Sequence, residues 1–304
     1  MSHDSILFAQ VGDLCICYET FGDPSQPPML LVAGLGCQMI EWDDALCEQL
    51  AAAGFWVIRY DNRDVGLSTK LDAFGIPDLQ SLPTSDRFRQ PQPHLSPPYT
   101  LRDMAADGIG LLDELGIASA HVVGISMGGM IVQHMAIHWP HRLRSMASIM
   151  SSSGDPSLPG VDARIQPLIQ PDPIGMDAFV NYYVTWEQAI GGPHYPRSAD
   201  YLRRMAQAIY LRGRHAPGKA RQTAAIRLSP PWHEALGGVT TPTLVIHGDV
   251  DPLLPLAHGE DTARRISHAE LLVIKGWGHG YPAPALWPQL IQALARHAKQ
   301  HDHP

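Results

Sequence analysis

The chain has 304 residues, of which 45% are hydrophobic and 17% are charged, and its formal net charge is -8. A chain of this length can bury a large core without disulfides or metal ions. Its acidic balance, with no stripe of lysine or arginine, argues against a nucleic-acid partner. No apolar run approaches the roughly 18 residues that cross a membrane, and the first residues lack the pattern of a secretory signal. We therefore expect a cytoplasmic protein without a nucleic-acid or membrane partner.

The apolar runs along the chain alternate with helical patterns. Residues 6–21 alternate loosely around Gly12-Asp13, which predicts a hairpin. Six further runs are predominantly apolar, as in strands buried on both faces, at residues 29–33, 55–60, 120–123, 145–150, 243–246 and 271–274, of which 145–150 is a weaker one. Helical periodicity separates them at residues 39–53, 101–115, 129–138, 259–266 and 285–298. This order predicts an α/β fold with a mostly parallel, doubly wound sheet and an antiparallel edge hairpin.

Two stretches interrupt this alternation. Residues 71–99 are rich in proline and polar residues, which favours a loop with little regular structure. Residues 152–235 contain no convincing strand, and their helical patterns lie at residues 176–190, 199–213 and 218–228. We expect a core of residues 1–151 and 236–304, with residues 152–235 as a helical lid over it. The aromatic side chains of this lid either line an apolar pocket or form the lid's own core, namely Tyr182, Tyr183, Trp186 and Trp232.

One turn in the sequence has the pattern of a nucleophile elbow. An apolar run is followed by Gly124-Ile125-Ser126-Met127-Gly128 and then by a helical run. In this order of strand, G-x-S-x-G and helix, the serine sits on a tight turn at the top of a sheet. The glycines make room for the turn, and the free N–H groups at the start of the helix point at the reaction centre. Ser126 is therefore the candidate nucleophile.

A serine hydroxyl needs a base, and the base needs a carboxylate that fixes its tautomer and stabilises its charged form. On a fold of this kind the acid follows a late strand and the histidine follows the last strand. His279 lies in a glycine-flanked turn after the last predicted strand. Three acids compete for the third role. Asp251 is favoured over Asp249, which lies nearer the strand and can cap the turn, and over Asp155, which follows an earlier strand.

The chemistry also needs two N–H donors for the negative charge that develops on the substrate oxygen. One is the amide of Met127, the residue after the candidate nucleophile. The second comes from the loop after the early strand at 29–33, where position favours the Leu35 amide over that of Gly34. Gly34, Trp186 and Trp277 are the candidates for the substrate pocket.

The sequence offers no clear metal or cofactor site. The charged loop at residues 61–66 fits neither an EF-hand nor a P-loop, and we expect Arg63 to pair with Asp61 or Asp64. A solvated tail is favoured over a metal cluster for His297, His301 and His303. The cysteines lack metal-ligand spacing and are expected to be buried free thiols in a reducing compartment. No cofactor and no metal ion is predicted.

At these motifs the chain resembles the α/β-hydrolase superfamily. The likeness runs in order from about residue 6 to residue 299, and its most specific parts are Tyr60-Asp61-Asn62-Arg63-Asp64-Val65-Gly66-Leu67-Ser68, Gly124-Ile125-Ser126-Met127-Gly128, Gly248-Asp249-Val250-Asp251-Pro252 and Gly276-Trp277-Gly278-His279. Within it, the chain is similar to the aclacinomycin methylesterase-type serine hydrolases, which remove a methyl ester from anthracycline polyketides. Related esterases and cofactor-free haloperoxidase-like perhydrolases share the motifs.

We expect a carboxylic ester hydrolase that acts on a small molecule through a Ser-His-Asp triad and an acyl-enzyme. Perhydrolysis, lactone hydrolysis and carbon–carbon bond hydrolysis use the same triad and are the alternatives within the enzyme class. A hydrolase fold that binds a ligand without turnover is the alternative from another class. Serine at the elbow argues against dehalogenase or epoxide hydrolase chemistry, in which a carboxylate is the nucleophile.

Overall fold

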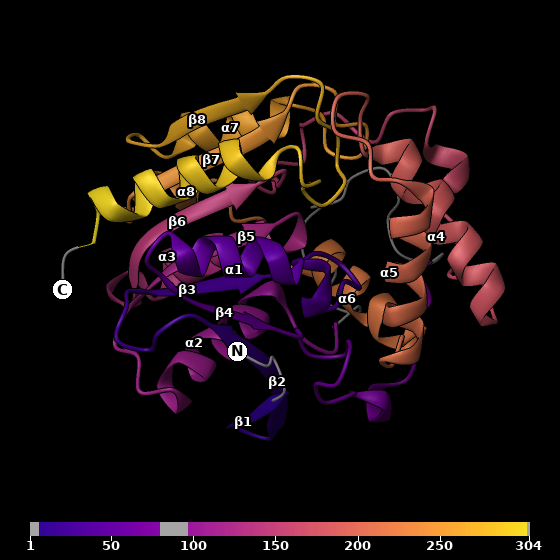
Figure 1. Cartoon of the computed structure of the whole chain (residues 1–304), viewed down its shortest axis with the longest axis horizontal. Coiled ribbons are helices and arrows are strands. Elements are labelled where there is room, and N and C mark those ends of the chain that lie inside the picture. The colour runs from indigo at the N-terminus through magenta and orange to yellow at the C-terminus, as the bar shows by residue number, and fades with distance from the viewer. Residues whose placement is uncertain (1–5, 80–96, 303–304) are drawn as a thin grey trace.

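The computed structural model describes residues 6–79 and 97–302. Eight strands of this described part form one sheet in the order β1-β2-β4-β3-β5-β6-β7-β8 (Figure 1). Strands β3 to β8 run parallel, whereas β2 is antiparallel to both β1 and β4. The strands are β1 (Leu7–Val11), β2 (Leu14–Phe21), β3 (Pro28–Val32), β4 (Trp56–Tyr60), β5 (Ala120–Ile125), β6 (Leu143–Ile149), β7 (Thr243–Gly248) and β8 (Glu270–Ile274). The predicted mostly parallel sheet with an antiparallel edge hairpin is confirmed.

Helices cover both faces of the sheet, so the central strands are predominantly apolar. In β3, Leu30 and Val32 face a cluster that includes residues of α2 and α3, whereas Met29 and Leu31 face residues of α1 and α8. Helix α7 packs along β7 and β8. These helices are α1 (Asp44–Ala52), α2 (Leu101–Glu114), α3 (Met127–His138), α7 (Ala257–Arg265) and α8 (Trp287–Gln300).

The first predicted helix, at residues 39–53, is interrupted in the structure. A 3-10 turn covers Met39–Glu41, and α1 begins only at Asp44. The Asp43 side chain accepts a hydrogen bond from the Ala45 amide at 3.0 Å, which caps the helix there. The local capping residue therefore splits a pattern that periodicity alone reads as one helix.

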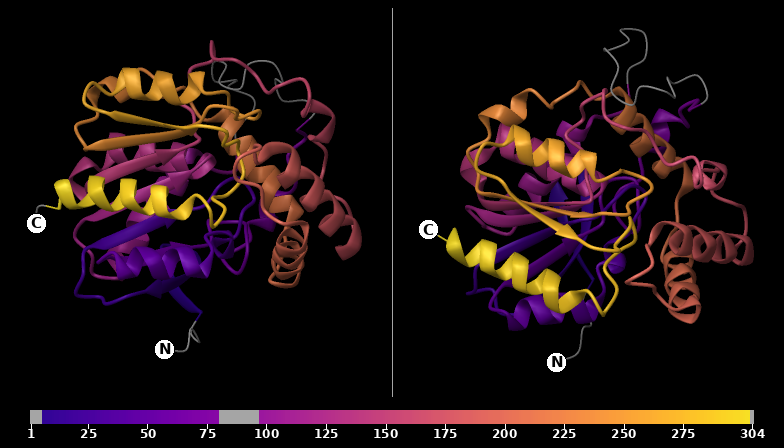
Figure 2. Two further views of the ribbon diagram at one scale, coloured as in Figure 1. Left: turned by 45° about the horizontal axis from the view of Figure 1, so that its top comes forward. Right: turned by 90° about the horizontal axis from the view of Figure 1, so that it is seen from above.

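Residues 152–235 form an excursion between β6 and β7 that we call the helical insertion. It contains α4 (Met176–Ile190), α5 (Ala199–Leu211) and α6 (Ala216–Leu228). The α4–α5 pair has a core of its own, made of Phe179, Val180, Tyr183, Val184, Leu202, Ala206 and Ile209. Figures 1 and 2 place the insertion at the end of the sheet opposite the C-terminus, where the carboxyl ends of the parallel strands lie.

Much of the predicted excursion at residues 71–99 lies outside the described residues, which omit 80–96. Its described part contains one short 3-10 turn, Asp72–Phe74, in accord with little regular structure there. Among the described residues, every helix is too short or too polar to cross a membrane.

Candidate active site

Ser126 occupies a tight turn between β5 and α3. Its backbone φ is 55°, in the left-handed region, and its amide donates to the Ile149 carbonyl of β6 at 2.9 Å. A Cβ at Gly124 would lie 2.1 Å from the Gly128 carbonyl oxygen, and a Cβ at Gly128 would lie 2.1 Å from the Val32 carbonyl oxygen. Both positions therefore require glycine, and the G-x-S-x-G spacing reflects the close packing of this turn against β3.

A continuous chain of hydrogen bonds joins Ser126, His279 and Asp251. The Ser126 Oγ atom lies 2.9 Å from His279 Nε2, and His279 Nδ1 lies 2.7 Å from Asp251 Oδ2. The three side chains follow β5, β8 and β7 respectively. They meet because the carboxyl ends of parallel strands lie at the same edge of a sheet. A carboxylate can only accept, so Nδ1 carries the imidazole proton and the Nε2 lone pair faces the serine hydroxyl.

The Asp251 carboxylate is buried and held at both oxygens. Oδ2 faces His279, and Oδ1 accepts from the amides of Leu253 and Leu254, each at 2.8 Å. Burial acts to raise the pKa of Asp251, but the charge and hydrogen bond of His279 outweigh it and hold the pKa below its usual value. His247 packs beside this carboxylate and contacts the Leu254 carbonyl at 2.7 Å, and burial lowers the pKa of His247, which favours its neutral form. The Asp251 carboxylate is therefore ionised and fixed in orientation.

The two competing acids lie elsewhere. Asp249 is exposed, and its Oδ1 accepts from the Gly276 amide at 2.6 Å, so it caps the neighbouring loop. Asp155 forms an ion pair with Arg265 and accepts from Ser157. Among the described residues, neither acid contacts His279.

The loop after β3 packs directly against the elbow. A Cβ at Gly34 would lie 3.5 Å from the Ser126 Cβ. The Gly34 amide donates to the Tyr281 hydroxyl at 3.1 Å and is therefore occupied. The amides of Leu35 and Met127 have no acceptor within the part of the chain that the structure describes. Two N–H groups beside Ser126 are thus available to a bound molecule, and Leu35 is favoured over Gly34.

The other two predicted pocket residues, Trp277 and Trp186, differ in burial. Trp277 is 1% exposed, and its indole donates to the Gly280 carbonyl at 3.2 Å, so the side chain belongs to the core beneath the loop. Trp186 is half-buried on α4 and stacks on Tyr182, with ring centroids 6.4 Å apart. A tryptophan flanked by glycines can form a pocket wall or occupy the core, and Trp277 occupies the core.

The remaining aromatic residues of the insertion divide between two environments. Tyr183 is buried in the α4–α5 core, and its hydroxyl donates to Glu41 Oε1 at 3.1 Å. Trp232 instead packs against α3, where its indole donates to Gln133 Oε1 at 2.7 Å. Trp232 therefore belongs to the core around α3 and not to the α4–α5 core.

Backbone hydrogen bonds fasten the end of α4 to the loop that carries His279. The His279 amide donates to the Ile190 carbonyl at 2.6 Å, and the Gly278 amide donates to the Gly191 carbonyl at 3.0 Å. A Cβ at Gly278 would lie 1.9 Å from the Ile190 oxygen, so glycine is required for this close approach. The position of His279 is thus tied to the helical insertion.

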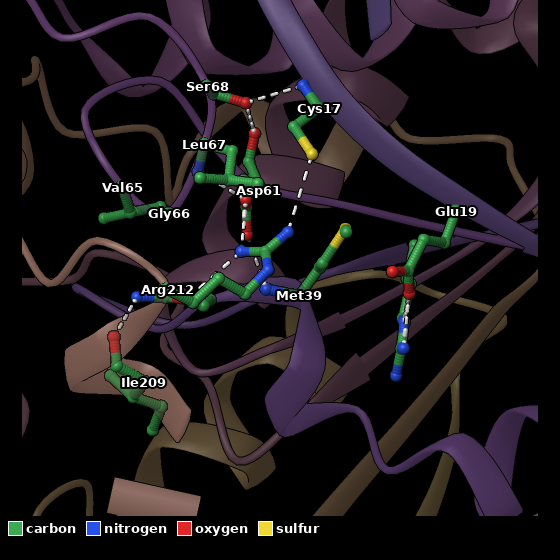
Figure 3. Close-up of polar contacts among 12 residues, drawn as sticks. Cys17, Glu19, Met39, Asp61, Val65, Gly66, Leu67, Ser68, Ile209 and Arg212 are labelled. Atoms are coloured by element: carbon green, nitrogen blue, oxygen red, sulfur yellow. Dashed lines mark hydrogen bonds and ion pairs between the residues drawn. The ribbon is translucent and has the colours of Figure 1, made fainter. Parts of the chain in front are cut away.

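Two arginines of the insertion bind the charged loop that follows β4. Figure 3 shows Arg212, just after α5, with its Nη1 atom 2.6 Å from Asp61 Oδ2 and its Nη2 atom 3.5 Å from the Cys17 sulfur. The fully buried Asp61 carboxylate also accepts from the amides of Met39 and Leu67, each at 2.8 Å. Asp61 therefore connects three segments of the chain, which contain Met39, Leu67 and Arg212.

The prediction that Arg63 pairs with Asp61 or Asp64 is wrong. Arg63 instead binds Asp107 of α2 through two contacts of 2.6 Å. Asp64 accepts two bonds from Arg221 of α6, at 2.7 and 2.8 Å. The arginine partners of both aspartates lie more than 150 residues further along the chain, so sequence proximity pointed to the wrong arginine.

The described residues contain no group of three or more His, Cys, Asp or Glu side chains that could hold a metal ion. His297 is buried in α8 and contacts the Pro242 carbonyl at 3.3 Å, which corrects the expectation of a solvated position. His303 lies outside the described residues. All four cysteines are free, and Cys17 and Cys47 are buried.

Comparison with known proteins shows the family to which the chain belongs. Rhodomycin D methylesterase DnrP of Streptomyces peucetius is 30% identical over 306 residues, which cover 92% of this chain and 94% of the relative. The 3-oxoadipate enol-lactonase 2 of Acinetobacter baylyi is 26% identical and covers 86% of each chain. A crystal structure of a hydrolase from Pseudomonas aeruginosa is similar in fold, with a TM-score of 0.68, 24% identity and 99% of each chain covered. A family described as alpha/beta hydrolase fold matches residues 27–281, and the chain therefore belongs to the α/β-hydrolase family.

Proposed function

We propose that this protein is a serine-dependent carboxylic ester hydrolase. The observation that carries the proposal is the unbroken sequence of contacts from Ser126 Oγ to His279 Nε2 at 2.9 Å and from His279 Nδ1 to Asp251 Oδ2 at 2.7 Å. Its order Ser, Asp, His along the chain is the order of this fold's hydrolases. The methylesterase relative supports the same class of reaction.

In the acylation step, Ser126 Oγ attacks the ester carbonyl carbon as His279 Nε2 takes the hydroxyl proton. The carbonyl oxygen becomes negatively charged and is held by the amides of Leu35 and Met127. The tetrahedral intermediate then expels the alkoxide, and His279 gives it the proton, so that an alcohol leaves and an acyl-serine remains. Asp251 stabilises the imidazolium throughout and stays ionised.

In the deacylation step, His279 takes a proton from water as the water oxygen attacks the acyl carbon. Collapse of the second intermediate breaks the bond to Ser126 Oγ, which recovers its proton from His279. The products are one carboxylic acid and one alcohol. The helical insertion, residues 152–235, acts as a lid in this proposal, because its backbone is bonded to the loop that carries His279.

A methyl ester is the first substrate to test, given the methylesterase relative. A lactone is the second, because a lactone is an internal ester and a relative is an enol-lactonase. The assay compares methyl, p-nitrophenyl and lactone substrates, with and without peroxide, so that perhydrolysis is measured beside hydrolysis.

The decisive variant is Ser126→Ala, with Ser25→Ala at an exposed turn as the matched control. We expect Ser126→Ala to lower kcat by on the order of 10⁴ or more, and the control to match the parent. Near-parental esterase activity in Ser126→Ala would exclude Ser126 as the nucleophile. If the parent turned over none of these substrates while Ser126→Ala bound a ligand as tightly as the parent, a non-catalytic binding protein would replace the proposal.

A further inference from the structure

A cavity of about 280 Å³ lies beside the loop that carries His279. Its walls include Glu187 of α4, Tyr195 and Arg197 of the segment between α4 and α5, and Gly280 and Tyr281, which directly follow His279. The Tyr281 hydroxyl also accepts the Gly34 amide, so the same residue borders the loop next to Ser126. The cavity and the loop next to Ser126 therefore share Tyr281 as a neighbour.

Glu187 brings an unused hydrogen-bond acceptor to the cavity. It lies in the last turn of α4, immediately before the residues that bind the His279 loop, and its Oε2 atom is 3.5 Å from the place of a Cβ at Gly280. Within the described residues, its carboxylate has no hydrogen-bond donor and no ion-pair partner within 4.0 Å. Burial raises the pKa of Glu187, and the charges of Arg197 and His279 act against that rise. A half-buried carboxylate without a protein donor is left to water, which a donor group on a ligand can replace.

Arg197 brings unused donors to the same cavity. Its Nη2 atom donates to the Pro282 carbonyl at 3.0 Å, and its guanidinium lies 5.0 Å from the ring centroid of Tyr201. Its Nε and Nη1 atoms are buried without a hydrogen-bond partner among the described residues. Arg197 and Glu187 thus line one cavity without forming an ion pair with each other there.

We propose that Glu187 and Arg197 form a specificity subsite that binds a hydroxyl group on the ester substrate, an inference that rests on the function proposed above. A hydroxyl can donate to the Glu187 carboxylate and accept from the Arg197 guanidinium at the same time. An ammonium group has no lone pair for Arg197. A carboxylate substituent is disfavoured by Glu187 itself and by Glu41, a buried carboxyl whose pKa burial and nearby Glu187 raise to about 7.

The test uses two pairs of isosteric esters. In one pair the hydroxyl is on the acyl chain (methyl ω-hydroxyhexanoate and methyl heptanoate), and in the other it is on the alcohol (ω-hydroxybutyl acetate and pentyl acetate). We expect the parent to favour the hydroxylated member of at least one pair by about tenfold or more in kcat/KM, because only that member can form a hydrogen bond to a charged side chain of the subsite. Glu187→Leu is expected to abolish this preference while activity on the deoxy member is kept.

Two further variants separate recognition from structure. Glu187→Gln keeps one acceptor oxygen and should retain part of the preference, whereas Thr185→Val, at an exposed position of the same helix outside the cavity lining, should retain all of it. A merely structural role for Glu187 predicts equal losses on both members of a pair. An unchanged ratio in Glu187→Leu, or no preference in the parent, would overturn the subsite.

A binding measurement distinguishes failure of the subsite from failure of the esterase proposal. The same four compounds are titrated by calorimetry into Ser126→Ala, with and without Glu187→Leu. If Ser126→Ala binds the hydroxylated compounds with a Glu187-dependent preference but the parent hydrolyses none of the four, the subsite is supported and the esterase proposal is contradicted. Turnover without a Glu187-dependent preference leaves the esterase and removes the subsite. If the protein neither binds nor hydrolyses any of the four compounds, both the subsite and the esterase proposal are overturned.

Discussion

Replacement of Asp251 by asparagine tests whether this carboxylate sets the state of His279. The new side chain has the same shape, but one of its oxygens becomes an NH₂ group that only donates. If the NH₂ takes the Oδ2 position, it faces His279 Nδ1 at 2.7 Å and forces the imidazole proton onto Nε2. His279 then has no lone pair for the proton of Ser126.

The alternative orientation of the amide is blocked by the loop. With its oxygen turned to His279, the NH₂ group would face the Leu253 and Leu254 amides, which now donate to Oδ1 at 2.8 Å each. Donors would then face donors in a buried position, which costs about 1–3 kcal/mol for each unsatisfied group. The first orientation, with the wrong tautomer, is therefore favoured.

We expect Asp251→Asn to lower kcat by on the order of 10⁴, as for the equivalent change in a Ser-His-Asp protease. This factor corresponds to about 5 kcal/mol of transition-state stabilisation. The assay is steady-state hydrolysis of a p-nitrophenyl ester, with the melting temperature as a check of folding. Asp249→Asn is the matched control, because Asp249 is exposed and contacts the Gly276 amide instead, and a change of less than about threefold is expected.

A folded Asp251→Asn protein with kcat within about tenfold of the parent would refute this reasoning. A large loss in Asp249→Asn together with a small loss in Asp251→Asn would reassign the acid.

Gly124→Ala should lower esterase activity and stability together, by about 1–3 kcal/mol in unfolding free energy, because its Cβ would lie 2.1 Å from the Gly128 carbonyl; retained kcat and melting temperature would contradict the packing argument. His134 is buried, and burial lowers its pKa from 6.5 to about 3, so the unfolded chain takes up a proton that the folded protein refuses as pH falls below 6.5. Roughly 2 kcal/mol of stability should be lost between pH 8 and pH 5 from this group, and urea unfolding of His134→Leu should show a correspondingly smaller loss. Arg221→Met removes the ion pair from the buried Asp64 carboxylate, which keeps only its bonds from Leu71 and Tyr99, and should destabilise the protein by about 3–5 kcal/mol, measured in the same way; a shift below about 1 kcal/mol would show that this pair does not fasten the insertion.

Local patterns predicted the parts of this protein that depend on neighbours in the chain. Predominantly apolar runs correspond to β3 to β8. Helices cover both faces of the central strands, whereas β8 is an edge strand with Leu271 and Val273 exposed, which corrects the expectation that the run at 271–274 is buried on both faces. The G-x-S-x-G pattern marks the elbow, because the turn has no room for side chains at Gly124 and Gly128. The order of Ser126, Asp251 and His279 could be anticipated for a topological reason: each follows a parallel strand, and the ends of such strands converge.

Contacts between distant segments were decided only by the tertiary structure. The charged loop after β4 contains both signs, but Asp61 and Asp64 bind arginines of the insertion and Arg63 binds α2, since these segments pack on either side of the loop. The same holds for the cavity beside His279. Glu187 and Arg197 carry no recognisable motif, and they reach the His279 loop only because the end of α4 is bonded to its backbone. Chain order thus determined which residues meet at the end of the sheet, whereas the docking of the helical insertion determined what surrounds them.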